Sequence, residues 1–121
     1  MRRNLDNSAY IHHISDSIQE IINYTSNHTY GQFLKNDWDQ AALMRYLEVI
    51  GEAANKLEER FRIKNSHIKW RKIIDLRNIL IHDYMDVDVH IMWNIMIRDI
   101  PELKQKIDKI ILVKQRKQDN A

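Results

Sequence analysis

The segment VHIMWNIMIRDIPELKQKIDKII, residues 89–111, decides the fold class. Its large apolar residues recur three or four positions apart, which is the spacing of one face of an α-helix. The pattern keeps its register through Pro101, so it predicts either one kinked helix or two nearly collinear helices, because proline suits a first helical turn. The residues of this face are Val89, Met92, Trp93, Met96, Ile100, Leu103, Ile107 and Ile111.

Three earlier segments have the same periodicity. A first helix is expected over residues 7–26 and a second from Trp38, with Asp37 as its N-cap. The second helix carries an apolar face that is expected to continue to Phe61. A third helix is expected over residues 66–81, with Ser66 as its cap.

Small residues and polar residues mark two further features. The polar stretch 26–37 contains one of the two glycines and predicts a loop. Gly51, Ala53 and Ala54 make the middle of the second helix thin, so a neighbouring backbone is expected to approach it closely.

The composition favours long helices in one domain. The chain has 121 residues, two glycines and one proline, so turns are few and elements are long. We predict an all-α, antiparallel up-down bundle of four to five helices over residues 1–113. The basic, polar tail, residues 114–121, is expected to fray.

Several classes of protein and site are disfavoured by the same counts. Without cysteine there is no disulfide and no thiolate metal site. The six histidines form no His-x3-His or Glu-x2-His pair in a predicted helix, so no metal site is expected. No apolar run approaches the ~20 residues that span a bilayer, and no signal core follows the N-terminus. We therefore expect a cytoplasmic protein without a membrane partner.

The stretch RNILIHDY, residues 77–84, places polar residues where the pattern predicts a buried helix. At about 100° per residue, Arg77 falls in the middle of the apolar face of the third helix. An isolated buried charge costs several kcal/mol, so Arg77 must be paired, hydrated or facing a cleft. Asn78 and His82 are four residues apart and hence neighbours on a helix surface.

Two interpretations of this stretch remain open from residue types alone. In the structural one, the arginine binds carbonyls at the helix end, the histidine complements the helix dipole and the tyrosine packs. In the catalytic one, a neutral imidazole accepts the proton of a ribose 2′-hydroxyl and a guanidinium holds the phosphate. Such chemistry needs no metal, because RNA supplies its own nucleophile.

The motif resembles that of a known family. Arg77, His82 and Tyr84 fit the spacing Arg-x4-His-x-Tyr, which is similar to the motif of HepT-like toxins in the HEPN superfamily. Three longer segments resemble family segments in the same order: EVIGEAANKL (48–57), IKWRKIIDLRNILIHDYMDVDVHIMW (68–93) and DIPELKQKI (99–107).

The resemblance implies a function, a set of partners and roles for individual residues. It implies a homodimeric bundle that cleaves RNA without metal or cofactor, with Arg77 and His82 catalytic and the motif lining a cleft between subunits. It also implies an MntA-like minimal nucleotidyltransferase antitoxin that adds AMP to Tyr84. Asn78 is a candidate for orienting His82. Asp83, at a free position of the motif, is a further candidate for an orienting or substrate-contacting role, although its charge beside His82 could disfavour RNA.

A dimer is also expected on chemical grounds. One histidine per motif cannot both deprotonate the nucleophile and protonate the leaving oxygen, whereas two motifs across a two-fold axis can. The alternative function is a non-catalytic helical binding module that partners a nucleotidyltransferase, with its tyrosine as a docking or modification point.

Other residues carry open alternatives. Glu52 is expected on a solvated face with Arg45, or else at a partner subunit or paired with Arg77. Ile91 and Ile95 could pack in a dimer interface or in the core. The three tryptophans are expected to be core or interface anchors rather than stacking platforms for bases. The basic tail, Lys114 to Lys117, could contact phosphate or be solvated.

Overall fold

The computed structural model describes residues 6–80 and 88–120, and within these ranges the regular structure is helical. The all-α prediction is confirmed. None of the described helices is long and apolar enough to cross a membrane. The elements are α1 (Asn7–Asn27), α2 (Tyr30–Leu34), α3 (Asp37–Lys56), α4 (Glu59–Lys64), α5 (Trp70–Ile74), α6 (Leu76–Leu80), α7 (Val89–Asn94), the π-helical turn η1 (Ile95–Asp99) and α8 (Ile100–Asp119).

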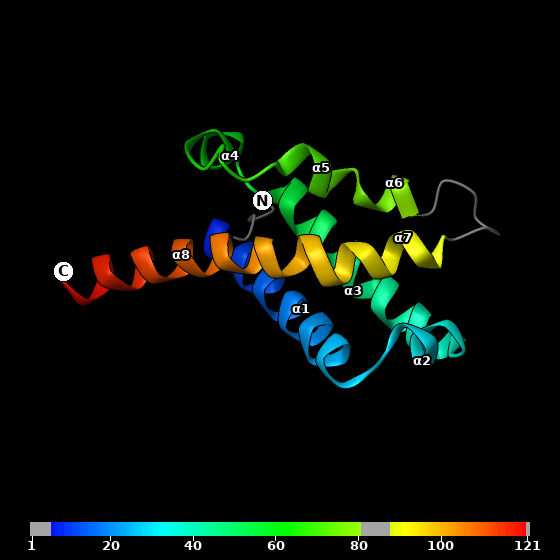
Figure 1. The fold of residues 1–121 in the computed structure, drawn as a ribbon. Coiled ribbons are helices and arrows are strands. Elements are labelled where there is room, and N and C mark those ends of the chain that lie inside the picture. The colour runs from blue at the N-terminus through cyan, green and yellow to red at the C-terminus, as the bar shows by residue number, and fades with distance from the viewer. Residues whose placement is uncertain (1–5, 81–87, 121) are drawn as a thin grey trace.

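The long helices form an antiparallel bundle with α3 at its centre (Figure 1). Helix α1 packs against α3 and α8, and α3 also carries the short helices α5 and α6. Helices α7 and α8 join through η1 into one long helix, which runs antiparallel to the α5–α6 arm (Figure 1). The last turns of α8 project past the rest of the bundle.

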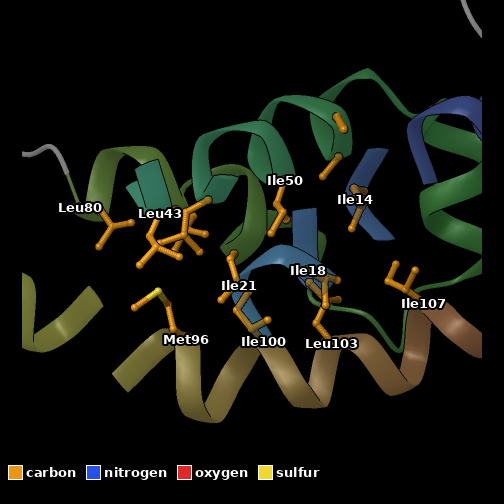
Figure 2. Close-up of a cluster of buried hydrophobic side chains, with 14 of the residues drawn as sticks. Ile14, Ile18, Ile21, Leu43, Ile50, Leu80, Met96, Ile100, Leu103 and Ile107 are labelled. Carbon is orange, nitrogen blue, oxygen red and sulfur yellow. The ribbon is translucent and has the colours of Figure 1, made fainter. Parts of the chain in front are cut away.

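The core lies where these helices meet, and it is built from the predicted apolar faces. Figure 2 shows branched side chains from α1, α3, α6 and the α7–α8 helix interdigitating. Burial of such a side chain contributes about 1.5–3 kcal/mol, so this cluster is the main source of stability. Its fully buried members include Ile14, Ile18, Ile21, Leu47, Ile50, Met92, Met96 and Ile107.

The stretch predicted as a loop contains a short helix. Thr29 caps α2 with its hydroxyl oxygen, which accepts from the backbone N–H of Gln32, and the Gln32 side chain accepts from the Thr29 N–H. This reciprocal capping box compensates for the shortness of the helix. Helix α2 buries Phe33 completely. The N-cap of α3 is Asn36 rather than the predicted Asp37.

The second predicted helix ends earlier than its apolar pattern. Helix α3 stops at Lys56, and Leu57 has an extended backbone. The Arg62 guanidinium donates to the carbonyls of Ala54 and Asn55, at 3.0 and 3.1 Å, and so satisfies acceptors at the end of α3. Phe61, predicted as a continuation of α3, lies on the separate helix α4.

The fourth predicted helix is continuous. Asp88 caps α7 by accepting from the backbone N–H groups of His90 and Ile91. The N–H of Ile100 bonds to the carbonyl of Ile95, five residues earlier, which widens the helix just before Pro101. The widened turn lets the helix pass the proline, which cannot donate and would crowd the preceding turn. The helix then continues to Asp119, whereas fraying was expected from residue 114.

A partly buried hydrogen bond joins α1 to α3. The Tyr24 hydroxyl donates to Asp39 Oδ2 at 2.8 Å, and the ring of His28 stacks on that of Tyr24 with centroids 3.9 Å apart. Burial, followed by the hydrogen bond to Asp39 and the charge of Asp39, raises the pKa of Tyr24 to about 12.

Candidate functional site

The α5–α6 arm is fixed to α3 by a close backbone approach. A Cβ at Gly51 would lie 3.0 Å from the carbonyl oxygen of Ile73 and 3.6 Å from that of Ile74. Ala53 and Ala54 are buried nearby. The predicted close approach at the thin middle of this helix is therefore confirmed, and α5 is the element that makes it.

The arm contains a break that the sequence pattern did not predict. Asp75 ends α5 with its N–H bonded to the carbonyl of Arg71 at 2.9 Å, and its own carbonyl accepts from Asn78 and Ile79 at 2.9 and 3.1 Å. The Asp75 carboxylate also pairs with Arg71 Nε at 3.2 Å. The prediction of one helix over 66–81 is therefore wrong, and Ser66 does not begin it: α5 starts at Trp70 without a side-chain cap.

The break changes which residues of the motif helix face the core. Leu76 and Leu80 are the buried residues of α6, whereas Asn78 and Ile79 are exposed. The expected face, with Arg77 at its middle, assumed an unbroken helix, and the turn at Asp75 interrupts that helix before α6 begins.

The structure places the motif only in part. Arg77 and Asn78 lie on α6, and Asn78 is exposed at the surface. The other motif positions, His82, Asp83 and Tyr84, lie outside the described residues, as does Ile81. The described residues stop at Leu80, on α6, and resume at Asp88, just before α7.

A groove adjoins the motif helix. A cavity of about 430 Å³ separates the α5–α6 arm from η1 and α8. Its lining includes apolar side chains, among them Leu76 and Ile79 from the arm and Ile95 from η1. Five charged residues line it as well, namely Lys69, Lys72, Asp99, Glu102 and Lys106. The groove was not anticipated, because it depends on the spacing between two helices rather than on a sequence pattern.

Large apolar side chains remain exposed within the motif sequence and after it. Ile79 on α6 is 52% exposed and Ile91 on α7 is 41% exposed. Ile95, one turn after Ile91, is half-buried and packs against the core. Of the two isoleucines that were candidates for a dimer interface, Ile91 is therefore exposed on the surface of the monomer and Ile95 packs against the core.

Three other sequence candidates have defined places. Glu52 lies on the outer face of α3, where Arg45 Nη1 contacts it at 3.3 Å and Glu48 at 3.4 Å. Trp70 and Trp93 are buried, as expected of core anchors, but Trp38 is 88% exposed. Over residues 6–80 and 88–120, no group of three or more His, Asp or Glu side chains is placed to hold a metal ion.

Known proteins share the region that contains the motif and the groove. A family model described as ribonuclease HepT-like matches residues 14–110, which include α6, the groove and every motif position. The chain belongs to the HepT-like ribonuclease family. The HepT-like match ends at residue 110, so the last turns of α8 lie beyond it.

Curated relatives of this HepT-like chain have ribonuclease names. A "Putative RNase" of Methanocaldococcus jannaschii is 36% identical over 116 residues, covering 96% of this chain and 96% of the relative. A "Probable ribonuclease HepT" of Thermococcus cleftensis is 36% identical over 101 residues, covering 84% of this chain and 92% of the relative.

A third relative is longer. A "Gamma-glutamylcyclotransferase and putative RNase" of Methanocaldococcus jannaschii is 40% identical over 106 residues, which are 88% of this chain but 48% of that protein. The chain thus spans about half the length of this relative and nearly all of the other two. No solved structure gives a significant match.

Proposed function

We propose that this protein is a metal-independent endoribonuclease, the toxin of a toxin–antitoxin pair. The observation that carries the proposal is the family match over residues 14–110, which contains Arg77, His82 and Tyr84 at the motif spacing. The anchoring of α6 supports it, because the buried Leu76 and Leu80 fix the helix that bears Arg77.

The chemistry follows from the two side chains. The neutral His82 imidazole takes the proton from a ribose 2′-hydroxyl, whose oxygen attacks the adjacent phosphorus and displaces the 5′-oxygen. Arg77 balances the charge that develops on the phosphate oxygens. The products are a 2′,3′-cyclic phosphate and a 5′-hydroxyl. Asn78, four positions before His82 in the sequence, is assigned to orienting it.

The site is completed by a second copy of the chain. The leaving 5′-oxygen must gain a proton while His82 holds the one it has taken, so a partner motif supplies the acid. Ile79, between Arg77 and His82 in the sequence, and Ile91 on α7 are exposed, which fits an apolar interface beside the two motifs. Replacing both by aspartate should reduce the mass in light scattering from about twice 14.6 kDa to 14.6 kDa.

A matched variant controls for surface charge. Ile63 on α4 is 67% exposed and lies away from the motif helix, so Ile63→Asp should leave the dimer intact. A wild-type chain that is monomeric at micromolar concentration, or a dimer that survives the double substitution, would contradict the interface.

Tyr84 is assigned as the regulatory residue. A minimal nucleotidyltransferase antitoxin would transfer AMP from ATP to the tyrosine oxygen, releasing pyrophosphate. The added phosphate would compete with RNA for the Arg77 guanidinium, and the nucleoside would obstruct the cleft. Tyr84→Phe should escape this modification and retain its fold, since only one hydroxyl is removed.

The deciding experiment is RNA cleavage by purified protein whose mass shows that it is unmodified. Activity should survive EDTA and yield cyclic phosphate ends. His82→Ala and Arg77→Ala should each reduce the rate by roughly 10²–10⁴-fold. Loss of activity on chelation, restored by a divalent ion, would refute the mechanism, and a folded variant that cuts at the wild-type rate would refute that residue's role.

A second function is favoured by one residue. Asp83 places a negative charge directly beside His82 in the sequence, and this charge opposes the approach of a phosphate. If the unmodified protein binds the nucleotidyltransferase but cleaves no RNA, the chain is a non-catalytic binding module.

A further inference from the structure

The projecting end of α8 concentrates positive charge. Residues 109–119 contain four basic side chains and one acidic one, a net charge of +3, whereas the whole chain carries +2. The rest of the protein is therefore slightly negative. Because this segment is helical to Asp119, its cations have fixed spacings rather than the variable ones of a frayed tail.

The end of α8 has two distinct faces. One face meets α1 and α4 and lines a small cavity of about 140 Å³ with residues that include Ile110, Ile111 and Lys114. The opposite arc, about 140° wide, is exposed and contains Lys109, Leu112, Val113, Arg116 and Lys117. Within the described chain, the ion pairs involve none of its three cations.

This basic face continues the groove beside the motif helix. Lys106 lies one turn before Lys109 on α8, and with Lys69 and Lys72 it lines the groove. Lys106 Nζ also donates to the carbonyl of His67 at 3.5 Å, which places this turn of α8 against the start of α5. Positively charged side chains therefore form a row that begins on the arm that bears Arg77, crosses the groove and continues along α8.

Two carboxylates reduce the positive charge of the groove without making it negative. Glu102 pairs with Lys106 at 3.3 Å, which weakens that lysine as a phosphate ligand. Asp99 also lines the groove. Three lysines against two carboxylates leave the groove with a small positive excess, so most of the attraction comes from the end of α8.

We propose that Lys109, Arg116 and Lys117, with Lys69 and Lys72, hold the single-stranded RNA that flanks the cleaved phosphate. The inference rests on the ribonuclease function proposed above and names the residues that position its substrate. From Lys106 to Lys117 the path is about 17 Å long at 1.5 Å per residue, so it contacts several successive phosphates.

The chemistry favours RNA over an acidic protein as the occupant. Attraction to the phosphates of RNA requires a row of cations but no particular base sequence or surface shape. It arises from the counterions that are released when the cations neutralise the phosphates. Leu112 and Val113 are the apolar residues of the face, too few for the apolar core of a stable protein interface. Their aliphatic surface lies between the cations and is available to ribose.

The test uses an RNA that the protein cannot cut. Binding of a labelled 12-nucleotide and a 4-nucleotide RNA to His82→Ala protein is measured by fluorescence anisotropy across a salt series. Adding Lys109→Gln, Arg116→Gln and Lys117→Gln should weaken binding of the longer RNA roughly tenfold to hundredfold at 0.1 M salt. The slope of log affinity against log salt should fall in magnitude by about 2, at about 0.7 for each phosphate that a cation no longer neutralises.

A matched control removes the same charge elsewhere. Lys35→Gln, Arg45→Gln and Lys56→Gln alter exposed cations of the α2–α3 side, and they should change binding less than twofold. The shorter RNA should bind both triple variants equally. In the active protein, the α8 triple variant should raise KM for the longer RNA and leave kcat unchanged, and circular dichroism should show unchanged helix content.

The outcomes separate this inference from the proposed function. If the active protein cuts RNA but the α8 variant binds and cuts like wild type, the path is wrong and the ribonuclease stands. If the active protein cuts nothing while RNA binding still depends on α8, the path stands and the ribonuclease fails. If RNA binding is unchanged and only binding to a nucleotidyltransferase is lost, the face is a protein interface and the proposal is overturned.

Discussion

The two glycines of this chain should respond oppositely to the same substitution. Gly51 lies in the interior of α3 and Gly31 in the first turn of α2, so replacing them by alanine removes all or part of the intrinsic penalty of about 0.8–1 kcal/mol that glycine imposes in a helix interior. The two sites differ in the space around the new methyl group. This difference decides whether the substitution raises or lowers the free energy of unfolding.

At Gly51 the methyl group would lie 3.0 Å from a backbone carbonyl oxygen. A backbone atom cannot rotate away, so α5 must move by a few tenths of an ångström. Overpacking of this kind typically costs about 1–3 kcal/mol, which exceeds the gain in helix propensity. We therefore expect Gly51→Ala to destabilise the protein by about 0.5–2 kcal/mol. At Gly31 the nearest atom is Thr29 Oγ1 at 3.8 Å, an ordinary contact, so Gly31→Ala should be neutral or stabilise by up to about 1 kcal/mol.

Urea unfolding followed by circular dichroism measures both free energies of unfolding. The Gly51 variant should be the less stable of the two by about 0.5–3 kcal/mol. Folded Gly51→Ala protein should also cleave RNA more slowly, because displacement of α5 moves the motif helix. Equal or greater stability of Gly51→Ala relative to the wild type would show that the approach of α3 to α5 is looser than the structure has it.

Three further substitutions test other parts of the fold. Phe33→Ala should destabilise the protein by about 3–5 kcal/mol in urea unfolding, because the side chain is completely buried although it comes from a helix of five residues. In the folded protein the Tyr24 phenol should titrate near pH 12, as followed by ultraviolet absorbance, and Asp39→Asn should lower that pKa. Because this pKa is raised from the ordinary 10, its stabilising contribution is complete below pH 10 and is lost as the pH rises to about 12. Arg45→Ala should cost less than about 1 kcal/mol in the same unfolding assay, since its pairs with two glutamates are solvent-exposed.

The long helices could be predicted from the sequence because their apolar residues keep one period over many turns. The end of α3 at Lys56 could not be predicted from the sequence, because it depends on a residue far away in the chain. The side-chain oxygen of Asn7, at the start of α1, accepts from the backbone N–H of Glu58 at 3.0 Å. No glycine or proline marks the position, and a periodic pattern contains no information about such a contact.

The candidate site was predictable in its residue types but not in its surroundings. The spacing of Arg77, His82 and Tyr84 is visible in the sequence, and so is the thin helix that supports α6. The turn at Asp75 is not visible in the sequence, because aspartate is compatible with the interior of a helix as well as with its end. The residues of α6 that the structure shows buried, Leu76 and Leu80, follow this turn and were not part of the predicted apolar face.

The π-helical turn has a consequence for how the chain tolerates deletions. Losing one residue from a helix ordinarily rotates everything downstream by about 100°, which here would swing Ile107 out of the core. A π turn contains about one residue more than an α turn, so a deletion between Ile95 and Asp99 would convert it to α-helix and leave the downstream faces where they are. Pro101 would then oppose the tightened turn, at a cost of about 3 kcal/mol, unless it were replaced as well. The shortened chain, with alanine in place of the proline, would keep the same core and the same basic face of α8.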